Sequence, residues 1–68
     1  MWSYDSSAGK LYIVPLPDGT YGIKFDGIIW EACPTPQAQA DNVFARATGC
    51  PAIDALQQVP TDLSGWTY

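Results

Sequence analysis

Residues 10–33 read KLYIVPLPDGTYGIKFDGIIWEAC and contain the two turn signals that decide the fold. The first, Pro17-Asp18-Gly19, has the residue order of a type I turn that is closed by a glycine bulge. The second, Asp26-Gly27, is a strong two-residue hairpin signal between apolar residues. The segments around both turns are rich in β-branched and aromatic residues. The sequence therefore predicts an antiparallel β-meander with strands near residues 10–16, 20–26 and 28–33.

The turn types also predict which side chains share a face of this sheet, because alternate residues of a strand point the same way. Three pairs are expected on the core face across Asp26-Gly27, namely Phe25 with Ile28, Ile23 with Trp30, and Tyr21 with Ala32. If the first turn is bulged, Leu11 and Ile13 join that face, whereas a plain two-residue turn would reverse the first strand. In the bulged arrangement the second face carries Tyr12, Val14, Leu16, Lys24, Ile29 and Glu31.

A helix is expected after the meander, because Thr35 can cap it and Pro36 suits its first position. Its apolar positions are Ala40, Val43, Phe44 and Ala47, at helical spacing, and Gly49 is a stop signal. Val43 and Phe44 are expected to pack against Ile23 and Trp30.

A shorter second helix is predicted from Pro51 to about Gln58, with Ile53, Leu56 and Val59 facing inward, and Pro60 stops it. Residues 61–65 resemble a capped single turn that delivers Trp66. Trp2-Ser3-Tyr4 alternates apolar and polar residues, so a fourth strand at these residues is left as an alternative. The predicted fold class is therefore α+β in a single domain, residues 1–68: a three- or four-stranded antiparallel meander packed on one α-helix, followed by a short second helix and a C-terminal turn.

Composition excludes several kinds of chemistry. The 68 residues include 7 acidic side chains, 3 basic side chains and no histidine, for a net charge of -4. Without histidine there is no Ser-His-Asp or Cys-His catalytic machinery and no histidine-ligated zinc. Cys33 and Cys50 cannot complete a four-ligand zinc site, so they are expected to be small buried hydrophobes, with a disulfide left open. We expect no enzymatic activity, no metal and no cofactor.

The chain also gives expectations about its surroundings. It has no apolar stretch long enough to span a membrane, and its first residues lack the pattern of a signal peptide. A cytoplasmic protein without membrane contact is therefore expected. Direct nucleic-acid binding is not expected, because Lys10, Lys24 and Arg46 are too few and too scattered to neutralise phosphates.

The second half of the chain resembles a recurring type of small bacterial protein with no established activity. The matching stretches are Thr35-Pro36-Gln37-Ala38-Gln39-Ala40, Thr48-Gly49-Cys50-Pro51 and Pro60-Thr61-Asp62-Leu63-Ser64-Gly65-Trp66. The resemblance covers about residues 10–66 and implies a compact α+β fold and no catalytic residues. Gly65 departs from the acidic residue that is usual between Ser and Trp in that family.

The leading expectation for function is a non-catalytic protein-interaction module of bacterial or phage origin, bound to a protein partner or to a second copy. Its expected contact residues are Tyr12, Val14, Ile29 and Glu31, provided that the second sheet face is open. The terminal aromatics Trp2, Tyr4, Trp66 and Tyr68 decide this, because either end of the chain could fold over that face.

Two alternatives remain open at this point. An acidic inhibitor that imitates nucleic acid, of the anti-CRISPR or anti-restriction type, would present Asp26, Glu31, Asp41, Asp54 and Asp62 as a spaced row. A DNA-binding module made of a sheet and a helix fits the topology but not the charge.

Overall fold

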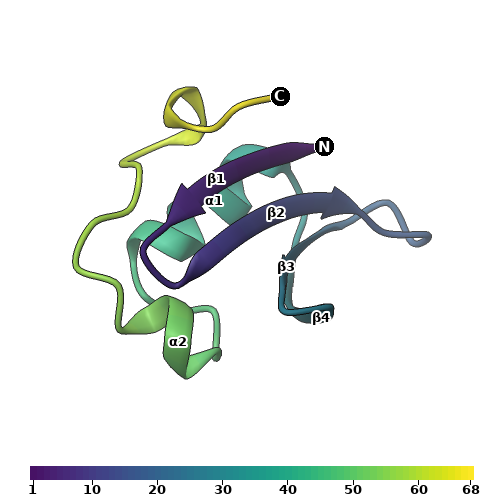
Figure 1. Ribbon diagram of the computed structural model, residues 1–68. Coiled ribbons are helices and arrows are strands. Elements are labelled where there is room, and N and C mark those ends of the chain that lie inside the picture. Colours follow the sequence, from purple (N-terminus) through teal and green to yellow (C-terminus); the bar gives the residue numbers. More distant parts are fainter.

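The computed structural model describes residues Met1–Tyr68 and contains a four-stranded antiparallel sheet in the order β1-β2-β3-β4. The predicted α+β meander is confirmed, and the N-terminal segment supplies the fourth strand (Figure 1). The strands are β1 (Trp2–Ser6), β2 (Gly9–Pro15), β3 (Tyr21–Phe25) and β4 (Ile28–Cys33). They are followed by the helices α1 (Pro36–Phe44) and α2 (Pro51–Asp54) and by a single 3-10 turn, η1 (Leu63–Gly65).

Both turns of the meander have the predicted type. Asp26 and Gly27 have positive φ angles of 54° and 77°, as a type I′ hairpin turn requires. At the first turn, the N–H of Leu16 donates to the Thr20 carbonyl at 2.8 Å and Gly19 takes a φ of 87°, which is the bulged arrangement. Ile13 consequently pairs with Ile23, and the predicted placement of Leu11 and Ile13 in the core is confirmed.

A β-bulge in β4 overturns two of the predicted pairs. Lys24 still pairs with Ile29, but Gly22 pairs with Ala32, so two residues of β4 lie opposite Ile23. The predicted pairs of Ile23 with Trp30 and of Tyr21 with Ala32 are therefore wrong, and Tyr21 pairs with Cys33 instead. The extra residue reverses the faces of Ala32 and Cys33 beyond it. Trp30 lies in the bulge itself and, instead of being buried in the core, is 37% exposed.

Gln39 of α1 explains how the sheet tolerates this bulge. Its side chain is fully buried, and its Nε2 donates to the carbonyls of Tyr21 at 2.7 Å and Glu31 at 3.1 Å. Because buried polar groups need partners, these two hydrogen bonds satisfy the Gln39 amide and tie α1 to both sides of the bulge.

The buried face of α1 follows from this contact, and it differs from the predicted face. Gln39, Ala40 and Val43 are buried, whereas Phe44 is 45% exposed. The prediction that Phe44 packs into the core is wrong, because the helix is rotated to bury Gln39. The helix also ends at Phe44 rather than near Thr48, and Arg46 follows with a left-handed φ of 57°.

The second helix is shorter than predicted, ending at Asp54 instead of Gln58. In a longer helix the Leu56 carbonyl would need an N–H from Pro60, and proline has none. Arg46 supplies the missing donors: its Nε and Nη2 donate to the Leu56 carbonyl at 3.1 and 2.9 Å. The chain beyond α2 is therefore held by Arg46 and not by helical hydrogen bonds.

The core lies between the sheet and the elements that follow it. Strands β2 and β3 contribute Leu11, Ile13 and Ile23, and the rest of the chain contributes Ala40, Val43, Cys50, Ile53, Leu56 and Trp66.

The two ends of the chain meet beside β1 (Figure 1). Ser3 and Thr67 exchange backbone hydrogen bonds of 2.7 and 2.8 Å, so the C-terminal segment pairs with the outer edge of β1. The Tyr4 ring lies 5.8 Å from that of Trp66, and the Trp2 ring lies 4.8 Å from that of Tyr68. Since Trp2 and Tyr4 pair with Ile13 and Leu11, these terminal aromatics lie on the core face. No helix has the length and apolar character needed to cross a lipid bilayer.

Candidate interaction surface

The second face of the sheet, which we call the open face, is built from alternate residues of β2, β3 and β4. Tyr12 and Val14 point away from the buried Leu11 and Ile13, and their register partners are Lys24 and Gly22. Ile29 also pairs with Lys24, so Tyr12, Lys24 and Ile29 form one row of side chains across three strands. The predicted places of Tyr12, Val14 and Ile29 are therefore confirmed by the register.

Because Gly22 has no side chain, neighbouring side chains of the open face pack over it. A Cβ atom at this position would lie 2.6 Å from Cγ2 of Ile29 and 3.3 Å from Cδ1 of Leu16. Both side chains therefore lie over the glycine, which joins the ends of β2 and β4 into one surface. The residues of this surface are Tyr12, Val14, Leu16, Gly22, Lys24 and Ile29.

The rest of the chain packs against the opposite face of the sheet. Helices α1 and α2 and the C-terminal Trp66 surround Leu11, Ile13 and Ile23, and the terminal aromatics lie on that side as well. The alternative in which a chain end folds over the second face is therefore not what the structure shows. Tyr12, Val14 and Leu16 are half-buried among their sheet neighbours, and Ile29 is 42% exposed.

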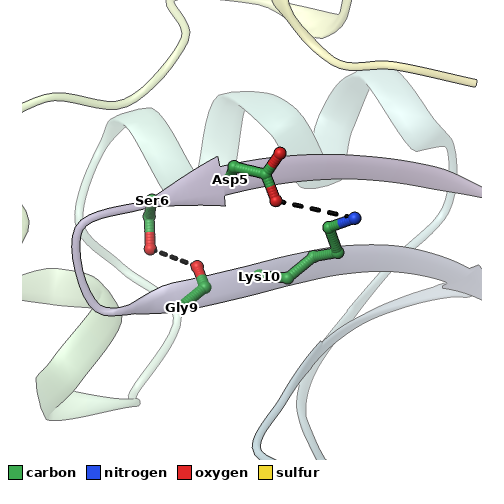
Figure 2. A network of polar contacts seen from close by, with 4 residues as sticks. All are labelled: Asp5, Ser6, Gly9 and Lys10. Atoms are coloured by element: carbon green, nitrogen blue, oxygen red, sulfur yellow. Dashed lines mark hydrogen bonds and ion pairs between the residues drawn. The ribbon is translucent and has the colours of Figure 1, made fainter.

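Charged side chains border the open face. Lys10 Nζ lies 3.6 Å from Asp5 Oδ1, and Figure 2 shows this ion pair between β1 and β2, next to the contact of Ser6 with Gly9. Both side chains are largely exposed, so the pair contributes little to folding. Lys24 is also exposed. Two of the three basic residues of this acidic protein thus lie on or beside the open face.

Glu31 does not have the position that the sequence predicted. It belongs to the bulge, and alternation from Gly22 places Ala32, not Glu31, in register with the open face. Its Oε1 accepts from the Ala32 N–H at 3.1 Å. Glu31 therefore lies at the outer edge of the sheet rather than among Tyr12 and Val14.

β4 also has an exposed apolar edge, which the predicted pairs did not indicate. Ile28, Ile29 and Trp30 follow one another with exposed fractions of 50, 42 and 37%. The sequence signal for the irregular register is Gln39, a polar residue next to apolar helix positions, because a buried amide has to bond to a nearby polar group.

The five acidic residues of the inhibitor alternative lie on five different elements or turns. Two of them are held by local hydrogen bonds: Asp54 accepts from the backbone N–H groups of Thr48 and Gly49, both at 3.1 Å, and Asp62 accepts from the Ser64 N–H at 2.9 Å. Asp41 accepts from Gln37 at 2.8 Å. Each of these three carboxylates thus has a structural partner, and the mimicry of nucleic acid stays a prediction.

Arg46 likewise has structural partners. Its guanidinium donates to carbonyls of Phe44, Leu56 and Gln57 at 2.7 to 3.1 Å and stacks 5.7 Å from the Phe44 ring. Because Lys10 is paired with Asp5, only Lys24 among the basic side chains is left to face a solution partner.

The two cysteines are free thiols, Cys50 buried and Cys33 half-buried. Burial, and secondarily the nearby Glu31 carboxylate, raises the pKa of the Cys33 thiol. A raised pKa lowers the thiolate fraction at neutral pH, and the thiolate is the nucleophile. His, Cys, Asp and Glu side chains do not gather in groups of three or more that could hold a metal ion.

Two hollows lie beside the segment after α2 and share Tyr4, Gln57 and Gln58 among their lining residues. Neither brings together a nucleophile, a base and a cation.

No protein-family model matches the sequence, and no curated protein and no solved structure matches it either. The resemblance to small bacterial proteins therefore stays a prediction. The open face is the most distinctive part of the molecular surface.

Proposed function

We propose that the protein is a non-catalytic interaction module that binds a protein partner on the open face of its sheet. The observation that carries this proposal is the one-sided packing of the molecule. One face of the sheet packs against α1, α2 and the terminal aromatics, including Trp66. The other face carries Tyr12, Val14, Leu16 and Ile29.

The chemistry of the open face favours a partner with an apolar centre and an acidic border. Its centre is aliphatic and aromatic, which is the composition that associates by excluding water. Lys24 lies beside that centre and is exposed, and an acidic group of a partner would complement it. The proposal also places the protein in the cytoplasm, which agrees with two cysteines that are free thiols.

The test compares capture by variants that differ only at the surface. The wild type, Val14→Glu and Phe44→Lys are immobilised and exposed to lysate of the source cells. Phe44→Lys is the matched control, because Phe44 is 45% exposed on the helix side of the molecule. Thermal unfolding checks that each variant is folded.

We expect a protein that binds the wild type and Phe44→Lys to be lost from Val14→Glu, because a buried unpaired carboxylate at an interface is costly. The same variant pair then gives the affinity of the purified partner, with a loss of at least about 2 kcal/mol expected for a residue at the centre of the contact. Equal binding by Val14→Glu, or binding lost only with Phe44→Lys, would contradict the proposal.

A further inference from the structure

The two edges of the sheet are not equivalent. The outer edge of β1 is occupied, because Thr67 pairs with Ser3. The outer edge of β4 has no neighbouring strand, and five of its six residues are exposed. Natural proteins protect open edges with proline, charged residues or β-bulges. In β4 the bulge and Glu31 lie in the second half of the strand, so Ile28 and Ile29 at its start have none of these protections.

The hairpin geometry shows which backbone groups are available at this edge. Phe25 and Ile28 flank the type I′ turn, and in such a turn the flanking residues hydrogen-bond to each other. In an antiparallel pair, bonded and non-bonded positions alternate. The N–H and C=O of Ile29 therefore point away from β3, into the space where another strand would lie.

We infer that two copies of the protein pair antiparallel through their β4 edges, about a two-fold axis at Ile29. This inference rests on the proposed function, because it enlarges the open face that the partner would bind. The pairing places Ile29 opposite Ile29 and Ile28 opposite Trp30 of the second copy. Two four-stranded sheets thereby become one sheet with a continuous open face.

The edge is complementary to itself, which favours a second copy as its occupant. Ile28, Ile29 and Trp30 are exposed and lie symmetrically about the proposed axis, so a single two-fold operation covers all three in both copies. Glu31, the one charged residue of β4, then lies opposite Gly27. The -4 charge of the chain thus places no like charges directly opposite each other at this contact.

The test is self-association of the purified protein without any partner. Sedimentation equilibrium between about 10 μM and 1 mM should show a mass that rises from 7.4 kDa toward twice that value, because a small edge contact gives a weak complex. Amide hydrogen exchange should show protection of the Ile29 N–H that increases with protein concentration.

Two variants address the edge separately. Ile29→Pro removes the outward N–H, which the sheet itself does not use, together with the Ile29 side chain at the centre of the contact. Ile28→Lys places a charge opposite Trp30 of the second copy. We expect each to weaken association at least about tenfold, as loss of the central hydrogen bonds or of one buried aliphatic contact predicts. Phe44→Lys should associate like the wild type. If Ile29→Pro does not fold, Ile28→Lys alone carries the test.

Val14→Glu separates this inference from the proposed function. Val14 lies on the open face but not on β4, so this variant should still self-associate while losing the partner. A protein that stays monomeric at 1 mM, or one whose association survives Ile28→Lys, would overturn the edge pairing. Association lost with Val14→Glu and kept with Ile28→Lys would show that the copies meet face to face, which also overturns it.

Discussion

At the scale of single residues, Gln39 is the side chain on which the arrangement of sheet and helix most depends. It is fully buried, donates to two strand carbonyls and accepts from Asn42 Nδ2 at 3.2 Å. The hydrogen bonds that it makes are long-range, because they join α1 to β3 and to the bulge of β4. An apolar side chain here would fill the space but remove the hydrogen bonds from α1 to the Tyr21 and Glu31 carbonyls.

We expect Gln39→Met to lower the free energy of unfolding by about 1–3 kcal/mol, the cost of leaving buried polar groups unpaired. Gln58→Met, at an exposed position, is the matched control and should change it by less than about 0.5 kcal/mol. Urea denaturation measures both. Equal effects of the two substitutions would mean that Gln39 does not support the bulge.

At the scale of elements, Arg46 determines where both helices end. Its left-handed backbone stops α1, and its guanidinium takes the place of the N–H that Pro60 lacks beyond α2. Asp54 acts in the same region, because its carboxylate accepts from Thr48 Oγ1 at 2.7 Å and from the N–H groups of Thr48 and Gly49. The connection between the helices is therefore held by side chains that bond to the backbone.

Arg46→Lys should lower the free energy of unfolding by about 1–3 kcal/mol, since lysine keeps the charge but cannot donate to three carbonyls from a planar fork. Lysine and arginine are equally strained at this left-handed backbone position, so the loss of stability measures the lost hydrogen bonds. Lys24→Arg is the control at an exposed site, with an expected change near zero. Thermal and urea unfolding give the comparison, and an unchanged Arg46→Lys stability would refute this role.

At the scale of the whole molecule, the closure of β1 by the C-terminal segment limits the sheet to one open edge. Two backbone hydrogen bonds join Ser3 to Thr67, and the Trp2 and Tyr68 rings pack edge-on at 4.8 Å. The same contacts keep the aromatics of both chain ends on the core face. Because the chain ends pack on the core face and along the edge of β1, the second face of the sheet and the β4 edge stay open.

Removal of Thr67 and Tyr68 should destabilise the protein by about 1–3 kcal/mol, from two hydrogen bonds and one aromatic pair. The Ser3 amide should then exchange faster with solvent, because its acceptor is gone. Removal of Tyr68 alone keeps both hydrogen bonds, so it should leave the Ser3 amide protected. Unchanged exchange of Ser3 in the shorter protein would argue against edge closure by Thr67.

Local chemistry explains what the sequence predicts correctly. The two meander turns depend on residues that tolerate positive φ, and α1 begins where Thr35 Oγ1 accepts from the Ala38 N–H at 3.0 Å. Such signals act over a few residues. They establish the strands, the start of the first helix and the faces of Leu11, Ile13, Tyr12 and Val14.

The incorrect predictions share a different cause. The bulge opposite Ile23, the rotation of α1 and the early end of α2 all depend on side chains that bond to backbone groups at least eight residues away. No periodicity reports such contacts, so the exposure of Trp30 and Phe44 and the position of Glu31 could not be predicted.

The sequence by itself thus determined the α+β meander and the composition of its two faces, because turn chemistry and alternation act locally. Only the tertiary structure decided which face stays open. That outcome depends on where the terminal aromatics pack. Trp2, Tyr4 and Trp66 join the core face because it offers them buried apolar partners, and the exposed Tyr68 follows by its contact with Trp2. The tertiary structure also decided that β4 is the free edge, since one backbone bridge between Ser3 and Thr67 closes the other.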